Sequence, residues 1–305
     1  MSAVEAVEQQ GSERAWRLRG AATPYLLLAP ALLALAAVSL YPIFYGVRAS
    51  VHRYRYGLDL GSAGTENYRN IYHDPVFWEA IKTTAKFVVI VVSIETLLGL
   101  LLALLVAREL RFSSWIRVTL ILPMTIAPVV VGVVWRLLYA SDIGVVNPLF
   151  HALGLGTPNV LATGTSAFFG LVAVDVWEWT PLLFLIILAG LHSMPQDPIE
   201  ASQVDGATRL QTFFHQTLPL LRPVLLVAVV LRTIDAVGTF DQIFVLTKGG
   251  PGVSTQLISI YSYNTAFLFT QYGQAMAMLV ALLALLLLLM VVAVRLMRRT
   301  AEVVA

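Results

Sequence analysis

Six long apolar stretches constrain this 305-residue chain more than any other feature of its sequence. A helix needs about 20 mostly apolar residues to cross the hydrocarbon core of a membrane. The last stretch contains Leu282–Met290, where only one side chain is small, and the fifth is interrupted by Arg232 and Asp235. The expected spans are Pro24–Val47, Ala80–Ala107, Ile116–Tyr139, Ala167–Leu191, Pro223–Phe240 and Ala275–Leu296.

Composition supports this interpretation and excludes several classes of protein. Hydrophobic residues make up 58% of the chain and charged residues only 12%, against about 25% in ordinary soluble domains. A soluble enzyme of this size could not bury so much apolar surface, so we expect an all-α polytopic membrane protein. The net charge of +2 and the dispersed basic residues do not suggest a nucleic-acid partner.

Two residue types bear on metal sites and covalent chemistry. The chain has no cysteine, which excludes disulfides, thiolate metal sites and cysteine nucleophiles. None of its five histidines has a histidine partner three or four residues later. We therefore expect no metal site.

The distribution of lysine and arginine predicts the orientation, because cytoplasmic loops carry an excess of these residues. With six spans, eleven basic residues fall on the side of the two chain ends and seven on the other, whose middle loop Ala140–Ser166 has none. We expect a plasma-membrane (inner-membrane) protein with both termini in the cytoplasm. A polar tail, residues 1–22, without stable structure would precede a transmembrane domain, residues 23–305. The first span is longer than the apolar core of a signal peptide and no clear small-residue cleavage site follows it.

The longest inner loop, residues 193–222, is predicted to form two short helices. Asp197 suits an N-cap, with Pro198 at the first helical position and Glu200 at the third. Gly206 can end that helix by taking a positive φ, and Thr208 can cap the next helix.

The second of these helices carries apolar residues at helical spacing, namely Leu210, Phe213, Phe214 and Leu218. A cytoplasmic helix with exposed aromatic side chains needs a surface to pack on. It either lies on the membrane or docks into a partner protein, and the residues alone leave both alternatives open.

The same loop carries a recognisable motif. Glu200-Ala201-Ser202, then Asp205-Gly206-Ala207 and Leu218-Pro219, resembles the EAA loop of ABC importer permeases, and specifically of the carbohydrate-uptake family that includes maltose, trehalose and glycerol-3-phosphate systems. Three further segments agree in order: Leu122-Pro123 to Trp135-Arg136, Asp175 to Pro181, and Thr247 to Pro251. The resemblance covers roughly residues 24 to 299.

This resemblance implies the fold and role of a type I ABC importer transmembrane domain with about six helices. Such a permease pairs with a second, related permease, two ATPase subunits that bind ATP and Mg, and an extracytoplasmic solute-binding protein. In the family the EAA loop is a coupling helix seated in a cleft of the ATPase. The resemblance implies that role for Glu200, Ala201, Ser202, Asp205, Gly206, Ala207, Phe213, Phe214 and Pro219.

The sequence departs from the family pattern at three positions. Ser202 replaces the second alanine of the motif, which we expect to be harmless. Gln216 stands where isoleucine is usual, which puts one packing contact of the second helix in question. Lys248 replaces a glycine of the outer turn, so the backbone there can differ.

Charged residues within the spans each need a reason, since a charge at the bilayer centre costs about 2.5–3.5 kcal/mol on insertion scales. Arg232 and Asp235 lie three residues apart and could neutralise each other. Glu95 is expected to anchor a hydrogen bond between helices. Asp175 and Glu178 need a partner, for which Arg136 is a candidate.

Aromatic rings beside carboxylates are a common way for proteins to hold sugars. We therefore name a set of substrate-pathway candidates, with helix packing as the alternative role: Trp135, Asp175, Trp177, Glu178, Trp179, Asp235 and Asp241.

The sequence contains no P-loop, no zinc-protease motif and no nucleophile elbow. We therefore expect a transport subunit rather than an enzyme, without a cofactor of its own, whose energy comes from a separate ATPase. The alternative is a self-contained secondary transporter, but such a protein would be expected to show inverted repeats, and none is visible. The sequence does not identify the sugar.

Overall fold

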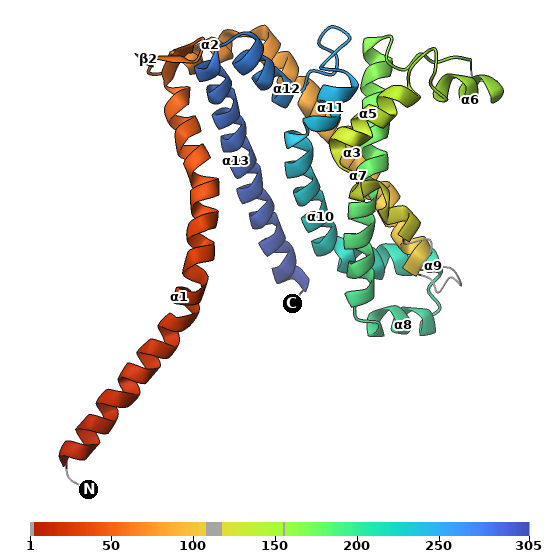
Figure 1. The fold of residues 1–305 in the computed structure, drawn as a ribbon. Helices are drawn as coiled ribbons and strands as arrows, with labels where there is room; N and C mark the ends of the chain where they lie inside the picture. The colour runs from red at the N-terminus through yellow and green to blue at the C-terminus, as the bar shows by residue number, and fades with distance from the viewer. Residues whose placement is uncertain (1–2, 108–117, 155, 305) are drawn as a thin grey trace.

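The computed structural model describes the backbone of residues 3–107, 118–154 and 156–304, and the side chains of residue 25 and of residues 27–107, 118–154 and 156–295. Over these ranges the chain is a helical bundle with a two-stranded hairpin at one end (Figure 1). Arg108, Arg111, Ile116 and Arg117 lie outside the described residues. Four helices contain stretches long and apolar enough to cross a membrane: Leu27–Ser50 of α1 (Ala3–Ser50), α3 (Pro75–Ala107), α7 (Gly164–Ser193) and Tyr272–Arg295 of α13 (Tyr272–Val304).

The third expected span is not a continuous helix, and this corrects the prediction. Residues 118–121 are helical, η1 (Pro123–Thr125) is a short 3-10 helix, and α5 (Pro128–Leu138) follows. Both η1 and α5 begin with proline, which lacks a backbone N–H and disfavours helix in the residue before it. The break packs against protein, since η1 contacts α7 and α5 contacts α11 (Asp241–Leu246). Irregular backbone at membrane depth is tolerated only in such surroundings.

The fifth expected span is α10 (Leu218–Gly238), a helix of 21 residues that packs against α3, α7 and α13. It is not one of the four long apolar helices, and it carries Arg222, Arg232 and Asp235. Of these charged residues only Arg232 is buried among the neighbouring helices, whereas Arg222 and Asp235 are exposed.

Shorter elements connect the long helices. At the end of the bundle with the hairpin they are β1 (His52–Arg55), antiparallel to β2 (Leu58–Ser62), with α2 (Glu66–His73), α6 (Val146–Ala152), α11, α12 (Ile258–Tyr263) and the π-helix η3 (Asn264–Leu268) (Figure 1). At the other end they are α8 (Asp197–Val204), α9 (Arg209–Thr212) and the π-helix η2 (Phe213–Thr217). In the outer turn Lys248 has φ +53°, a conformation that glycine adopts more easily.

Both chain ends and the loop 193–222 lie at the same end of the bundle, away from the hairpin (Figure 1). This arrangement agrees with an even number of crossings. The expected unstructured tail is wrong, because helix α1 begins at Ala3 and continues without interruption into the first span.

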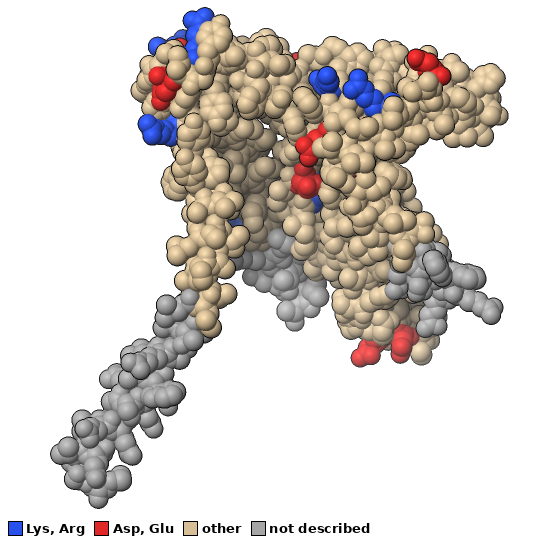
Figure 2. Space-filling model, in the orientation of Figure 1, with Lys and Arg blue, Asp and Glu red and all other residues tan. Residues whose placement is uncertain are grey.

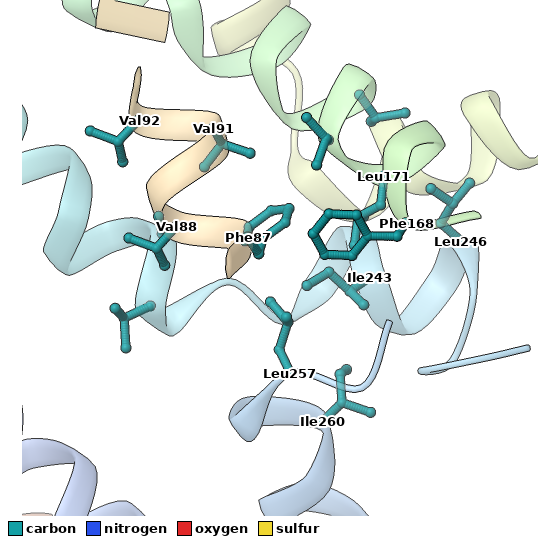
Figure 3. Packing of buried hydrophobic residues seen from close by; sticks show 14 of the residues in the cluster. Phe87, Val88, Val91, Val92, Phe168, Leu171, Ile243, Leu246, Leu257 and Ile260 are labelled. Carbon is teal, nitrogen blue, oxygen red and sulfur yellow. The ribbon is translucent and has the colours of Figure 1, made fainter. Parts of the chain in front are cut away.

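The hydrophobic core holds α3, α7 and α11 together (Figure 3). Phe87 of α3 meets Phe168 of α7 edge to face at 6.4 Å between ring centroids, and Ile243 of α11 packs into the same cluster. Further along, α3 approaches α7 closely at Gly99, where an added Cβ would lie 3.0 Å from the backbone nitrogen of Phe184. These three helices form the frame on which the polar residues are placed.

Candidate functional site

A single buried arginine ties three helices together. Arg232 of α10 is fully buried, and its Nε and Nη2 donate to the two carboxylate oxygens of Glu95 on α3 at 2.7 and 3.0 Å. Its Nη2 also donates to Asp175 of α7, and its Nη1 donates to Asp235 at 2.7 Å. Each nitrogen of the guanidinium therefore has a carboxylate partner, as a buried charge requires.

The structure decides three of the predictions about intramembrane charges. The pairing of Arg232 with Asp235 is confirmed, and so is the role of Glu95 as an anchor between helices. The proposed pairing of Arg136 with Asp175 or Glu178 is wrong. Arg136 is exposed and its Nη1 donates to the carbonyl oxygen of Val245 at 3.1 Å.

Gln242 of α11 completes the cluster. Helix α5 approaches α11 closely at Gly132, where an added Cβ would lie 3.0 Å from the carbonyl oxygen of Gln242. From this position Nε2 of Gln242 donates to Asp175, while its Oε1 is buried and has no partner among the described residues. The side chain thus offers an unused hydrogen-bond acceptor.

Beside the cluster lies a hollow of about 360 Å³, which we call the acidic hollow. Acidic side chains gather midway along the bundle in the space-filling view (Figure 2). The side chain of Asp235 is 49% exposed although one of its oxygens binds Arg232. The lining residues are Pro128, Trp179, Ile234, Asp235, Gly238, Thr239, Phe240, Asp241 and Gln242.

The structure brings three of the seven substrate-pathway candidates to this hollow, namely Trp179, Asp235 and Asp241. The other four lie elsewhere. Asp175 is fully buried in the cluster, and Trp135 packs against Trp177 with 5.5 Å between ring centroids. Glu178 is only 1% exposed, and neither of its oxygens has a partner among the described residues.

The hollow combines groups that suit a ligand with hydroxyl groups. Trp179 offers an aromatic ring, and the guanidinium of Arg232 lies 5.3 Å from the centre of that ring. Asp235 and Asp241 offer exposed acceptors and Thr239 adds a hydroxyl group, while the Oε1 of Gln242 is buried in the wall without a partner among the described residues. An aromatic face with a few convergent polar groups is the usual composition of a small-molecule site.

The loop 193–222 folds largely as predicted. Gly206 has φ +81°, and Thr208 forms a reciprocal cap with Gln211, whose backbone nitrogen donates to Oγ1 of Thr208 at 3.3 Å. The predicted N-cap at Asp197 is wrong, because Asp197 is already helical and Gln196 precedes α8 without a side-chain cap. Proline at position 198 therefore lies one residue further into the helix than expected.

Ser202, the departure from the alanine of the motif, has a structural partner. Its hydroxyl donates to the carbonyl oxygen of Ile199 at 2.7 Å and lies 3.2 Å from Oγ1 of Thr212. It therefore links the two short helices across Gly206. Gln216 is half-buried and faces a polar hollow of about 370 Å³ between them, not an apolar contact.

The loop leaves much of its surface uncovered. Three apolar side chains are strongly exposed, Val204 at 88%, Leu210 at 70% and Phe214 at 54%. Phe213 is half-buried against Phe214, and Glu200, Ala201, Asp205, Gly206 and Pro219 are exposed, while Ala207 is partly buried. Neighbouring exposed apolar groups on one loop are typical of an interaction surface.

Sequence reasoning missed Gln242 and Thr239. Gln242 directly follows Asp241, which was singled out as an acid just beyond the fifth span, so its position was a usable signal. Its contact with Asp175 joins residues that lie 67 positions apart, which no local pattern reveals.

Comparison with known proteins places these features in a family. Residues 95–302 match the family described as the binding-protein-dependent transport system inner membrane component. The trehalose/maltose transport system permease protein MalF of Thermococcus litoralis is 37% identical over 81% of this chain and 84% of its own length. The sulfoquinovosyl glycerol transport system permease protein SmoG of Agrobacterium fabrum is 35% identical over 84% of each chain.

Solved structures agree on the fold. A chain of a bacterial ABC transporter involved in the import of the acidic polysaccharide alginate superposes with a TM-score of 0.80 at 22% identity. The alignment covers 94% of this chain and 99% of that one. The observed bundle is therefore the fold of an ABC importer transmembrane domain.

Proposed function

Because the chain belongs to the family of binding-protein-dependent transport system inner membrane components, we propose that it forms one half of the translocation pathway of an ATP-driven carbohydrate importer. Relatives named as trehalose/maltose, sulfoquinovosyl glycerol and trehalose permeases support the substrate class. The acidic hollow supports it independently, since Trp179 and the acceptors around it suit a ligand rich in hydroxyl groups.

The other half of the pathway would come from a second, related permease. The apolar part of α1 is 0% buried and that of α13 is 11% buried, compared with 67% for α7. These faces are available to lipid and to the second permease. An extracytoplasmic solute-binding protein would deliver the carbohydrate to the end of the bundle that carries the hairpin.

Energy would enter through the loop 193–222. Its exposed Val204, Leu210 and Phe214 form an apolar surface that a cleft on an ATPase subunit could cover. ATP and Mg would bind to that subunit and not to this chain. Since the loop joins α7 directly to α10, its movement would reach the helices that carry Asp175 and Arg232 and would alternate access to the pathway.

The first test asks whether ATP hydrolysis by a separate subunit drives uptake. The purified chain alone is expected to hydrolyse no ATP, whereas proteoliposomes with both permeases, the ATPase and the binding protein take up carbohydrate only when ATP is supplied. Uptake by the chain alone, driven by an ion gradient, would instead support a self-contained secondary transporter. Hydrolysis measured by phosphate release in a preparation free of the ATPase would contradict the proposal.

The second test is topological. We expect both termini and the loop 193–222 to face the cytoplasm, because that side carries more arginine and lysine. Since the chain has no cysteine, a single cysteine can be placed at Ser2 or at Thr163, which precedes α7 at the end with the hairpin. In intact cells a membrane-impermeant maleimide should label only the variant with cysteine at position 163. Labelling of both variants from outside would refute the orientation.

A further inference from the structure

We propose that the acidic hollow selects substrates by charge and admits neutral or cationic carbohydrates in preference to anionic ones. This inference rests on the proposed function, because it names the substrate class of the same pathway. The named relatives leave the question open, since maltose and trehalose are neutral whereas sulfoquinovosyl glycerol carries a sulfonate.

Among the described residues, the wall of the hollow carries two carboxylates and no lysine or arginine. Asp235 is about half exposed, and Asp241 begins α11 with its side chain exposed. Two negative charges in a concave wall of low dielectric constant concentrate a negative potential, which attracts cations and repels anions.

The arginine next to the hollow does not offset this charge. Arg232 is fully buried and does not line the hollow, and each of its nitrogens already donates to a carboxylate. An anionic substrate would find no unused guanidinium here. The close carboxylates Glu95 and Asp175 cancel the charge of Arg232 as seen from the hollow.

The hydrogen-bonding groups point to the same class. Gln242 turns its donor Nε2 toward Asp175 and leaves its acceptor Oε1 without a partner among the described residues. The acceptors that the hollow exposes are the carboxylates of Asp235 and Asp241, beside this buried amide oxygen. Hydroxyl groups can donate to such acceptors, whereas a carboxylate, sulfonate or phosphate group cannot.

The potential can be measured without knowing the substrate. Gly238 lines the hollow, and a Cβ added there meets no atom within 4 Å, so the variant Gly238→Cys fits the structure. In the assembled transporter, built from cysteine-free partner chains, this cysteine reacts with a cationic trimethylammonium-ethyl or an anionic sulfonatoethyl methanethiosulfonate. The ratio of the two rates is compared with that of a small thiol in solution.

We expect the ratio of cationic to anionic rates to exceed that of the small thiol at least tenfold. Adding Asp241→Asn should lower the ratio about tenfold, because removing one nearby charge slows one reagent and speeds the other. Asp142→Asn, which neutralises an exposed acid outside the hollow, should leave it unchanged.

Two results would overturn the inference. One is a ratio no higher than that of the small thiol, which would mean that the second permease or the binding protein supplies compensating cations. The other is a cysteine that neither reagent reaches, since a pathway wall must meet water. The rates need neither ATP nor substrate, so a high ratio in a complex that takes up no carbohydrate would refute the proposed function and not the sign of the potential.

Discussion

Replacing Arg232 by methionine is expected to prevent most of the chain from accumulating in its folded form. The variant leaves Glu95 and Asp175 facing each other in the core without their cation. Removing one partner of a buried ion pair costs roughly 3–5 kcal/mol, a large part of the stability of a typical protein. The monodisperse fraction in detergent and its melting temperature, both followed by size-exclusion chromatography, measure the loss.

Two controls distinguish the effect of breaking the buried cluster from the effect of removing any arginine. Arg136→Gln removes an exposed arginine that donates only to a backbone carbonyl among the described contacts, and should leave the melting temperature nearly unchanged. The triple variant Arg232→Met, Glu95→Gln and Asp175→Asn removes all three buried charges and should recover much of the lost stability. A single Arg232→Met variant that melts like the wild type would show that the cluster does not hold the helices together.

Replacing Gly206 by valine is expected to uncouple the transporter while the chain still inserts into the membrane. Gly206 has φ +81°, and an added Cβ would meet no atom within 4 Å, so the cost comes from the backbone alone. A β-branched residue in that conformation costs about 1–2 kcal/mol, which corresponds to roughly a 5- to 30-fold loss in the population of the correct loop. Co-purification of the ATPase and ATP-driven uptake should fall by a similar factor.

The hairpin offers a matched control for this variant. Gly57 also has φ +81° with no atom within 4 Å of an added Cβ, but it lies at the opposite end of the bundle. Gly57→Val should carry the same strain and leave ATPase binding intact. Unlike Gly206→Val, the variant Gly206→Asn should keep ATP hydrolysis coupled to uptake, because asparagine tolerates positive φ. Equal loss of ATPase binding in Gly57→Val and Gly206→Val would assign the defect to general destabilisation.

A substitution at Glu200 changes the charge of the loop 193–222 without changing its backbone conformation. It is exposed on α8 and makes no side-chain hydrogen bond among the described residues, so Glu200→Ala should leave the loop folded. We expect weaker association with the ATPase, because the variant removes a carboxylate that we propose to pair with a basic side chain of the ATPase. If both Glu200→Ala and Gly206→Val bind the ATPase and transport like the wild type, the loop would instead be a hairpin lying on the membrane.

Local chemistry accounts for the parts of the site that sequence predicted well. The positive φ at Gly206 and the cap at Thr208 depend on residues within a few positions of each other. The error at Asp197 is of the same local kind, a shift of one residue at a helix end, where boundaries are least determined.

The broken third span shows where apolar content misleads. Hydropathy measures whether a segment can lie in the membrane but not whether its backbone stays helical. Pro123 and Pro128 were the available signal for the break, and the packing of η1 on α7 and of α5 on α11 makes it tolerable.

The sequence by itself determined the membrane class, the long apolar helices and the two short helices of the loop 193–222, because hydropathy, caps and glycine act over short stretches of chain. Only the tertiary structure decided which charges meet. Arg232 lies 137 residues from Glu95 and 57 from Asp175, and on sequence grounds Arg136 was a candidate partner for Asp175. Gly99 lets α3 approach α7, and α10 packs against both of these helices, so Arg232 can reach Glu95 and Asp175. A contact made by packing between distant helices leaves no periodic trace in the chain.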